Sequence, residues 1–581
     1  MCLTSCEDFL TKEDPNKVDA PSYFRNETDL ETYANGFLQR MLPDAEAIAT
    51  GDQHTDYLSW RGPWNYLQDN FNADDQGGWT WTNLRNINYY LDNMGRADCS
   101  EAIKNHYVGV GRFWRAWFYF NMVKQFGAVP WYEHVIDSED NGNLFKSRDN
   151  REDVMRKILE DIDFASKNCI TSKEMEVNSV RVTKYVALAL KARICLFEGT
   201  FRKYHANDPS TDTPWTADES AMYLRECADA CEKLIQSGRY SIVNNAAQVK
   251  TQYRELFTTE AINTNECIWA RAYNASLNVT HHLNSQFIVQ QNGSFAAVKE
   301  FVNTYLNTDG TRFTDKPGYE KVPFNEEFTD RDARMTQSLR HPGYTRKSNG
   351  SDLPQPPNFN YSSTGYQPIK WVIDDMSLDQ SVSPCNNSIP IIRYAEVLLS
   401  YAEAKAELGE FTEGIWNQTI KPLRERAGVV GTMPATADPY MAGYFLNTVS
   451  DKVILEIRRE RGIELFMENL RWADCMRWRM GRLLEREWHG IYVPAMNVNY
   501  DLDGDGTPDV CFVEKQPSST TKGVQYRIIG SDFQLTDGTS GNLVSYRSIE
   551  RKWDDKKYVR PIPTKAITDN PNLGQNPGWG K

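Results

Sequence analysis

Apolar residues recur at spacings of three and four along much of this chain, and this pattern constrains its fold more than any other feature. One stripe comprises Tyr107, Gly111, Trp114, Phe118 and Met122. Such spacing places side chains on one face of an α-helix. Gly127 and Pro130 follow the stripe, and both residue types end helices. The sequence therefore predicts a mainly α-helical protein.

Similar stripes predict helices in two stretches, about 84–240 and 390–480. Residues 151–168 are amphipathic, a helix runs from Thr183 to Gly199, and a last long helix covers about 455–470. Pairs of helices recur about every 34–40 residues, close to the period of the tetratricopeptide repeat (TPR). We therefore predict a TPR-like scaffold of helical hairpins.

Three stretches break the helical pattern, at about 50–83, 270–390 and 490–560. The second is rich in Asn, Gly, Pro, Tyr and Ser, whereas the third alternates like short strands and turns. Loops this long are usually functional or form subdomains. We expect an irregular, loop-rich second subdomain with short strands, within a single domain covering 21–581.

Charge and hydropathy exclude two classes of protein. The 581 residues include 79 acidic and 65 basic side chains, for a net charge of −14. An acidic chain without a basic block is a poor match for nucleic acid, so we expect no nucleic-acid partner. No stretch reaches the roughly 20 apolar residues of a transmembrane helix.

The extreme N-terminus, Leu3-Thr4-Ser5-Cys6, resembles the end of a bacterial lipoprotein signal that is cut before Cys6. Acyl chains on Cys6 would anchor the protein to a membrane. The polar residues that follow are typical of a tether. We predict that residues 1–20 form a lipoprotein N-terminus and tether. The basic and apolar parts of a signal peptide are missing, so Met1 looks like an artificial start.

The first irregular stretch is rich in tryptophan. Sugars are held by flat apolar faces, which Trp supplies, and by planar polar groups. A Gly-rich and Asn-rich setting favours an exposed loop, where binding residues tend to lie. The candidate ligand-binding residues are Trp60, Arg61, Trp64, Asp75, Trp79, Trp81 and Asn83. The alternative is that individual Trp residues anchor the loop to the core.

The second irregular stretch offers further ligand-binding candidates. Aromatic and amide side chains are mixed there, as sugar sites require. These candidates are Tyr273, Asn274, Tyr344, Tyr366 and Trp371.

The segment 501–509, Asp-Leu-Asp-Gly-Asp-Gly-Thr-Pro-Asp, indicates a calcium loop. Alternating aspartates with a following glycine surround a hard cation with oxygen atoms. The predicted ligands are Asp501, Asp503, Asp505, Thr507 and Asp509. Phe512 stands where an EF-hand has its bidentate Glu, so we expect an isolated loop in which Ca²⁺ has a structural role. The alternative is an acidic turn without metal.

The C-terminal third carries a group of specific motifs. Residues 458–465 read Arg-Arg-Glu-Arg-Gly-Ile-Glu-Leu and precede Arg471-Trp472-Ala473-Asp474 and Arg477-Trp478. The segments 391–399, 561–563 and 570–578 and the start, 6–10, add to the pattern. Together these motifs resemble the SusD/RagB family over essentially the whole chain.

The resemblance implies a lipoprotein at the cell surface, on the outer membrane of a Bacteroidetes cell. Such proteins cap a SusC-like TonB-dependent transporter and hold a nutrient for uptake, usually a glycan. The family is not enzymatic, and TPR-like helices with an irregular second half form its fold. The implied function is to capture an oligosaccharide or polysaccharide and deliver it to the transporter.

Three other functions stay open. RagB-type members handle peptides on the same scaffold. A glycoside hydrolase would need paired carboxylates, and no spacing singles out such a pair. A structural lid with a vestigial site is the last possibility.

The charged run at 458–465 has a structural interpretation. Arg461 can meet Glu464, and Arg471 can meet Asp474, because each pair is three residues apart on a helix. We therefore predict a salt-bridged helix packed against other elements rather than a catalytic site.

Overall fold

The computed structural model describes residues 23–172, 179–208, 214–288, 294–380 and 384–580. The helices up to residue 236 are α2 (Glu27–Met41), α3 (Ala45–Ala49), α4 (Thr82–Asn93), α5 (Glu101–Phe126), α6 (Asn141–Leu144), α7 (Arg151–Asn168), α9 (Lys184–Tyr204) and α10 (Ala217–Gln236). The later helices are α11 (Gln252–Thr258), α12 (Leu283–Ile288), α13 (Lys299–Val302), α14 (Ala333–Ser338), α15 (Tyr394–Glu407), α16 (Glu413–Arg426), α17 (Pro439–Tyr444), α18 (Lys452–Glu464), α19 (Arg471–Arg477) and α20 (Thr564–Asp569).

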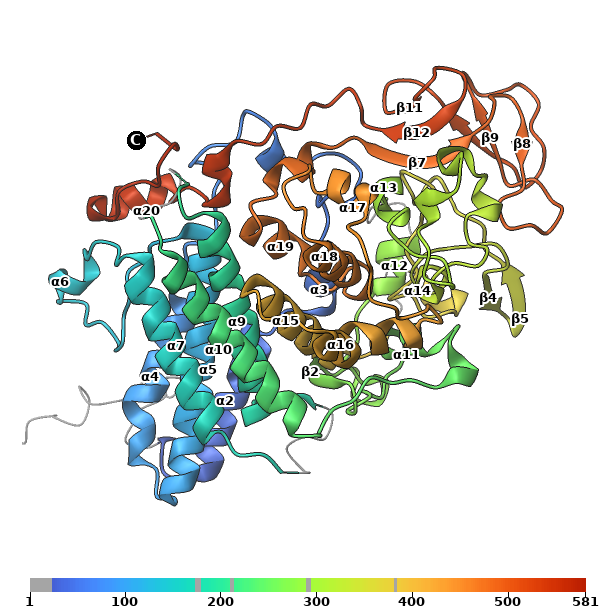
Figure 1. The fold of residues 1–581 in the computed structure, drawn as a ribbon. Helices are drawn as coiled ribbons and strands as arrows, with labels where there is room; N and C mark the ends of the chain where they lie inside the picture. Colours follow the sequence, from blue (N-terminus) through green and yellow to red (C-terminus); the bar gives the residue numbers. More distant parts are fainter. Residues whose placement is uncertain (1–22, 173–178, 209–213, 289–293, 381–383, 581) are drawn as a thin grey trace, which may run out of the picture.

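The longer helices form a stack in which each helix packs on the next (Figure 1). Helix α5 packs on α7, α7 on α9, α9 on α10 and α10 on α15, and α15 then contacts α16 and α18. The predictions of a mainly helical fold and of helices in these two stretches are confirmed. The comparison with TPR repeats stays a prediction.

Capping residues fix where the helices of this stack begin. The side chains of Ser100, Asn150, Thr183 and Thr216 each accept a hydrogen bond from a first-turn amide. These bonds satisfy amides that have no partner within the helix. Gly127 ends α5 with a φ of 70°, a conformation that favours glycine.

Two predicted helix ends are wrong. Gly199 does not end α9, which continues to Tyr204. A Cβ atom at Gly199 would lie 2.8 Å from Leu224 Cγ, so this glycine allows α10 to approach closely. The helix expected over 455–470 ends at Glu464, and α19 starts separately at Arg471.

Short strands occupy the irregular regions, as predicted. They are β1 (Leu58–Ser59), β2 (Cys267–Arg271), β3 (Ala296–Ala297), β4 (Thr345–Ser348), β5 (Ser351–Pro354), β6 (Ile389–Arg393), β7 (Trp488–Val493), β8 (Asn499–Tyr500), β9 (Val510–Val513), β10 (Gln525–Ile528), β11 (Phe533–Leu535) and β12 (Gly541–Ser545). Antiparallel pairs join β1 to β3, β2 to β6 and β4 to β5. Two three-stranded sheets have the orders β11-β12-β7 and β10-β9-β8.

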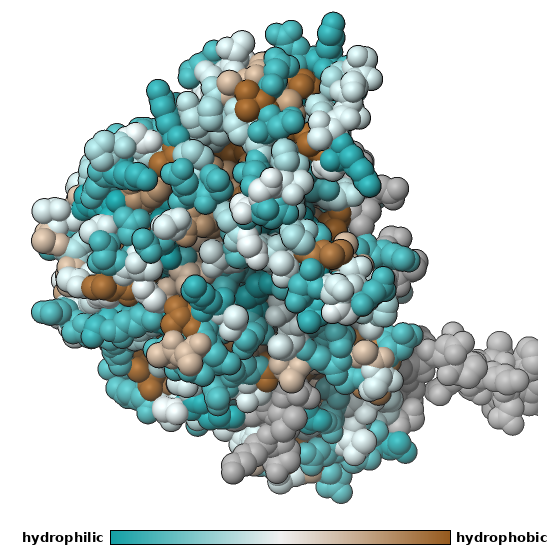
Figure 2. Space-filling view, turned by 90° about the vertical axis from the view of Figure 1, so that its right-hand side faces the viewer, coloured by the Kyte–Doolittle hydropathy of each residue, from teal (hydrophilic) through white to brown (hydrophobic). Residues whose placement is uncertain are grey.

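The strands β4, β5, β8 and β9 lie at one side of the molecule, away from the helical stack (Figure 1). Figure 2 views the molecule from this side and shows a largely hydrophilic surface with separate hydrophobic spots. Among the described residues, no helix is both long and apolar enough to cross a membrane. The described cysteines are free thiols, and all of them except Cys99 are buried, as expected for small apolar residues.

Helix α18 is buried along nearly its whole length, although it carries many charges. Its role as a salt-bridged helix is confirmed, but the predicted partners are wrong. Arg461 pairs with Asp474 at 2.7 Å rather than with Glu464. Arg471 pairs with Asp56 at 2.7 Å rather than with Asp474. The rule of three-residue spacing describes exposed helix faces, whereas these side chains meet other elements.

Glu464 is the centre of this network. It accepts hydrogen bonds from Arg426, Arg393 and Arg334, which come from three different segments. Burial alone would raise the pKa of Glu464, but these guanidinium groups hold it well below its ordinary value. The carboxylate is therefore ionised and fixes α18 relative to α14, α16 and β6.

Candidate functional site

A groove of about 600 Å³ lies where the start of α4, the segment 130–138 and the C-terminal tail meet. Its lining is a mixture of aromatic, polar and aliphatic side chains. The residues that matter below are Trp79, Trp81, Arg85, Asn88, Tyr132, His134 and Asn570.

Three half-buried aromatic rings form the apolar wall of the groove. The Trp79 and Trp81 rings are 5.4 Å apart in an edge-to-face arrangement, and Trp81 meets Tyr132 at 5.5 Å. Trp79 also packs on Phe126 at 5.0 Å, and that ring belongs to α5. The core therefore holds one side of the wall in place while part of each ring stays accessible.

Polar side chains of α4 hold the segment 131–135 against this wall. Asn88 Nδ2 donates hydrogen bonds to the carbonyl oxygens of Tyr132 and His134, at 2.9 and 3.2 Å. Asp92 accepts a hydrogen bond from the Val135 amide at 3.0 Å and lies 2.6 Å from His134 Nδ1. Helix α4 thus fixes the loop segment that forms this side of the groove.

Two polar groups along the groove are available to a ligand. The guanidinium of Arg85 is exposed and has no hydrogen-bond or ion-pair partner in the part of the chain that the structure describes. Burial raises the pKa of Tyr132 to about 12, so its hydroxyl is neutral and can both donate and accept. Together they offer the planar and hydroxyl donors that sugar hydroxyls require.

The C-terminal tail supplies the third wall. Arg148 Nε donates to the carbonyl of Leu573 at 2.7 Å, and Asn570 Nδ2 donates to the carbonyl of Lys146 at 2.9 Å. Asn576 Nδ2 reaches the carbonyl of Phe126, at the end of α5, at 2.9 Å. The motif at 570–578 is therefore a clamp that fixes the tail beside the aromatic wall.

The groove includes only two of the predicted loop residues, Trp79 and Trp81. Trp60 instead lies against Phe295 and His54, at 6.3 and 5.2 Å between rings. Trp64 meets Trp472 at 5.3 Å, with the Arg560 guanidinium 5.0 Å from its ring. Both are half-buried anchors of the loop, so the predicted ligand contact does not hold for them in this groove.

The remaining loop candidates also lie outside the groove lining. Arg61 is exposed, with its guanidinium 5.9 Å from the Trp60 ring. Asp75 accepts a hydrogen bond from the Asn72 amide at 3.0 Å and so shapes a turn. Asn83 lies in the first turn of α4, one residue beyond the lining residue Thr82.

The structure corrects the predictions made for the second irregular stretch. Tyr366 and Trp371 are fully buried and donate hydrogen bonds to Glu327 and to the carbonyl of Met467. Tyr273 and Tyr344 are buried as well. Asn274 caps a short turn by accepting from the Leu277 amide at 3.0 Å. Irregular segments form part of the core here, so their aromatic and amide-rich composition did not indicate an exposed binding surface.

The predicted calcium loop brings three carboxylates together. Oxygen atoms of Asp501, Asp503 and Asp509 lie within 4.8 Å of one another. Asp503 is buried, and within the part of the chain that the structure describes its Oδ2 has no hydrogen-bond partner. Burial, followed by repulsion from Asp503, raises the pKa of Asp509 to about 6. These residues fit a hard cation, which would satisfy the orphaned oxygen atom.

Among the predicted aspartate ligands, Asp505 does not join this cluster, whereas Thr507, which would contribute its backbone carbonyl, stays a prediction. Asp505 is exposed and accepts a hydrogen bond from the Thr507 amide at 2.6 Å. Asp501 accepts from the amides of Gly504 and Gly506, whose φ angles of 79° and 87° let the loop curl around it. The loop is therefore held in shape by its own amides.

Tyr132, Arg85 and Asn570 were missed from the sequence. Tyr132 lies two residues after Pro130, and an aromatic residue soon after a helix end was a signal that could have been used. No local pattern singles out Arg85, because exposed helical arginines are common.

Comparison of the sequence with models of known protein families agrees with the fold described above. The model described as "SusD family" matches residues 265–579, more than half of the chain. The chain belongs to the SusD family. A second model, described as "Starch-binding associating with outer membrane", matches residues 8–196.

Individual relatives of this SusD-family chain are distant. A SusD-like protein of Bacteroides ovatus is 22% identical over 566 residues, which covers 87% of this chain and 88% of the relative. The SusD-like protein P38 of Formosa agariphila is 25% identical over 64% of this chain and 66% of the relative. A solved SusD-like carbohydrate binding protein from Bacteroides fragilis has a TM-score of 0.68 at 21% identity, covering 95% of this chain and all of that one.

Proposed function

We propose that this SusD-family protein binds a glycan in the groove formed by Trp79, Trp81 and Tyr132. The observation that carries the proposal is the juxtaposition of three accessible aromatic rings with an unpaired guanidinium and a neutral hydroxyl. The description of the family model matched by residues 8–196, which contain most of the groove, supports it.

The chemistry of the groove favours sugars over extended peptides. A sugar ring presents C–H groups on its faces and hydroxyls around its edge, so it stacks on Trp while its hydroxyls bond to planar polar groups. A peptide bound by strand addition would need an exposed strand edge. The walls described above are helix, loop and tail, and we place no strand there.

Calorimetry of two variants tests the proposal. We expect the Trp79→Ala, Trp81→Ala double variant to lose measurable binding of the best oligosaccharide from a thermal-shift screen. The matched control is Trp64→Ala, which removes another half-buried Trp from the same loop but from outside the groove. Unchanged glycan binding by the double variant would contradict the proposal. A screen in which only peptides shift the melting temperature would favour the RagB-like alternative.

We further propose that the protein acts at the outer membrane and passes its ligand to a SusC-like TonB-dependent transporter, without enzymatic turnover. Anchoring would come from acyl chains on Cys6, which lies outside the described residues. Co-purification of the lipidated protein with such a transporter, followed by loss of glycan uptake when the protein is deleted, tests this role. Release of shortened glycans by the purified protein would overturn the non-enzymatic part.

Ca²⁺ bound by Asp501, Asp503 and Asp509 is our proposal for the acidic loop. When bound, the ion would neutralise three close carboxylates and stabilise the loop between β8 and β9. We expect about 1 mM Ca²⁺ to raise the melting temperature relative to EDTA, as for extracellular calcium modules. Asp503→Asn should abolish the difference, whereas Asp218→Asn, an exposed acid on α10, should preserve it. Equal melting with Ca²⁺ and EDTA would contradict the proposal.

A further inference from the structure

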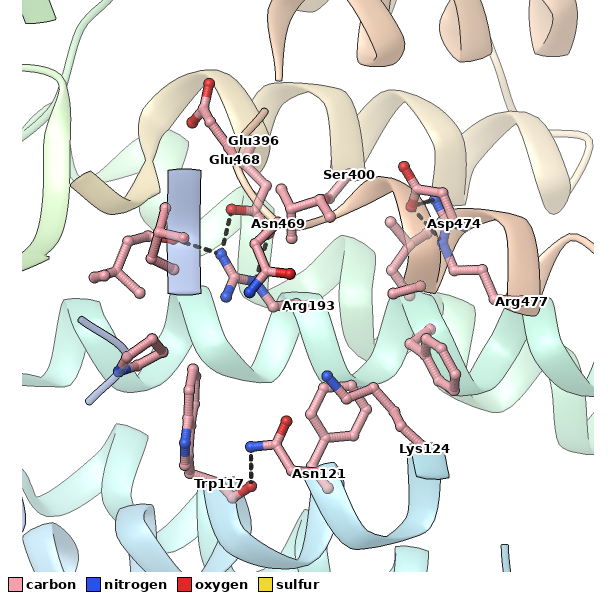
Figure 3. Close-up of a pocket in the computed structure, with 18 of the residues that line it drawn as sticks. Trp117, Asn121, Lys124, Arg193, Glu396, Ser400, Glu468, Asn469, Asp474 and Arg477 are labelled. Atoms are coloured by element: carbon pink, nitrogen blue, oxygen red, sulfur yellow. Dashed lines mark hydrogen bonds and ion pairs between the residues drawn. The ribbon is translucent and has the colours of Figure 1, made fainter. Parts of the chain in front are cut away.

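A second cavity, of about 290 Å³, lies between α5, α9, α15 and α19 (Figure 3). It shares no lining residue with the glycan groove. The rings of Trp117, Phe120 and Phe197 form its apolar side. Asn121, Ser400 and Asn469 add amide and hydroxyl groups.

Most charges at the wall of this cavity already have partners. Arg193 makes two hydrogen bonds of 2.7 Å with Glu396. Asp474 is shared by Arg461 and Arg477, at 2.7 and 2.9 Å. These groups hold the surrounding helices together and leave the carboxylates fully engaged.

Lys124 is the exception among these charged residues. It lies in the last turn of α5, and no hydrogen bond or ion pair joins its ammonium group to the described part of the chain. Its Nζ lies 4.6 Å from the Phe120 ring, and Figure 3 shows the side chain reaching toward the middle of the cavity. Burial, together with Arg193, lowers the pKa of Lys124 to about 8. The group is therefore still mostly protonated at neutral pH.

A second cationic group at the cavity is incompletely bonded. Arg461 lines the cavity, and its buried Nη1 has no hydrogen-bond partner among the described residues, although its Nε donates to Asp474. Burying unpaired cationic donors is unfavourable unless an acceptor compensates them. Arg461 Nη1 is such a donor, and the Lys124 ammonium at the same cavity is accessible from it and unpaired in the described part of the chain, so the two groups together indicate that an anion completes the cavity.

We infer that this cavity binds a small carboxylate-bearing sugar, with its carboxylate at Lys124. The volume is at the lower end of the range for ligand pockets, about 300–1,000 Å³, and so suits a single sugar unit. The aromatic side fits the face of a sugar ring, and Asn121, Asn469 and Ser400 can bond to its hydroxyls. A simple inorganic anion would leave both of these features unused.

Calorimetry with glucuronate as the probe, and with glucose as its neutral counterpart, tests the inference. We expect the parent protein to bind glucuronate and not glucose. Lys124→Met keeps the length of the side chain but removes its charge, and it should weaken glucuronate binding by about thirty-fold or more. The control Lys157→Met alters a partly exposed lysine of α7, with 44% of its side chain accessible, and should bind glucuronate as the parent does. Lys124→Gln provides a second variant of the same site.

Thermal melting separates binding from a structural role. If Lys124 serves a ligand, the ligand-free Lys124→Met protein should melt at the same temperature as the parent or about 1–2 °C higher, because an unpaired charge is removed. Lowered melting of both Lys124 variants would assign the lysine to the fold and overturn the inference. So would equal binding of glucuronate by parent and variants, or no binding by the parent.

The groove variants make this inference independent of the proposed function. Trp79→Ala, Trp81→Ala should keep glucuronate binding in the cavity while losing oligosaccharide binding in the groove. Loss of glucuronate binding in that variant, with Lys124→Met unaffected, would place the acidic sugar in the groove and overturn the cavity assignment.

Discussion

The two helical parts of the molecule bury their charges in different ways. In the part formed by α5, α7, α9 and α10, each of the following ion pairs joins two adjacent helices or two turns of one helix. Arg115 pairs with Asp161 at 2.6 Å, and Glu198 is shared by Arg151 and Arg202 at 2.7 and 2.8 Å. Apolar side chains fill most of the rest of these interfaces.

In the part formed by α14–α19 and β6, charges form a continuous network. Glu464 binds three arginines, and these reach onward to other acids such as Glu266 and Glu460. An apolar stripe can pack on several different partners, whereas a buried charge is strongly destabilising when its oppositely charged partner is missing. We interpret the network as the device that specifies which segments meet α18. Four predictions test this difference, from the largest expected effect to the smallest.

Removing the central carboxylate should produce the largest loss. Glu464→Ala leaves Arg334, Arg393 and Arg426 without their shared acceptor, so we expect it to reduce the free energy of unfolding by about 3–5 kcal/mol. Urea denaturation measures this change. A loss below about 1 kcal/mol would show that the network contributes little to stability.

Removing apolar volume from the other part should cost somewhat less. Leu190 of α9 is fully buried. Leu190→Ala should therefore lower the free energy of unfolding by about 2–4 kcal/mol, through lost burial and the cavity left behind. The same denaturation experiment ranks the two variants, and a larger loss for Leu190→Ala would reverse the comparison.

Acid should affect the two parts unequally. Although burial opposes it, arginines hold the pKa of Glu198 at about 2 and that of Glu464 well below its ordinary value. Because these pKa values are depressed on folding, their stabilisation is present above about pH 4.5 and is lost as the pH falls below it. Each such group contributes a slope of up to about 1.4 kcal/mol per pH unit.

The network contains more carboxylates with depressed pKa values, namely Glu403, Glu456, Glu464, Glu468 and Asp474. We therefore expect hydrogen exchange at pH 3 to lose protection in α18 before α9. Simultaneous loss in both helices would mean that the two parts unfold as one unit.

Exposed pairs should matter least. Lys233 and Asp229 lie 2.6 Å apart on the solvent face of α10. Their side chains are 57% and 50% exposed. Lys233→Ala should change the free energy of unfolding by no more than about 0.5 kcal/mol. A larger effect would show that pairing, rather than burial, determines how much these charges contribute to stability.

The same contrast explains what could be predicted from sequence. Helices α7 and α10 have one buried face, whereas α5 and α9 are buried on nearly all sides. In all four, apolar residues recur at helical spacing, so these helices could be predicted. The charged run of α18 was recognised as structural, but its partners were not, because Arg334 and Arg393 lie 130 and 71 residues from Glu464. Tertiary contacts over such separations leave no periodic signal.

Only the part of the candidate site that is contiguous in sequence could be predicted. Trp79 and Trp81 stand out because they lie in a Gly-rich loop beside each other. Tyr132 and Asn570 join them only through the fold. Tyr366 and Trp371 had the right chemistry for a sugar but are enclosed by the core.

The tail clamp has a consequence for the order of folding. The hydrogen bond from Arg148 to Leu573 joins residues 425 positions apart, whereas α9 and α10 are neighbours along the chain. Contacts between neighbouring helices form quickly, but closing so large a loop of chain is slow and entropically unfavourable. We expect the helical stack to form early and the groove beside Trp79 and Trp81 to be completed late, so that binding of the proposed glycan would report the final step of folding.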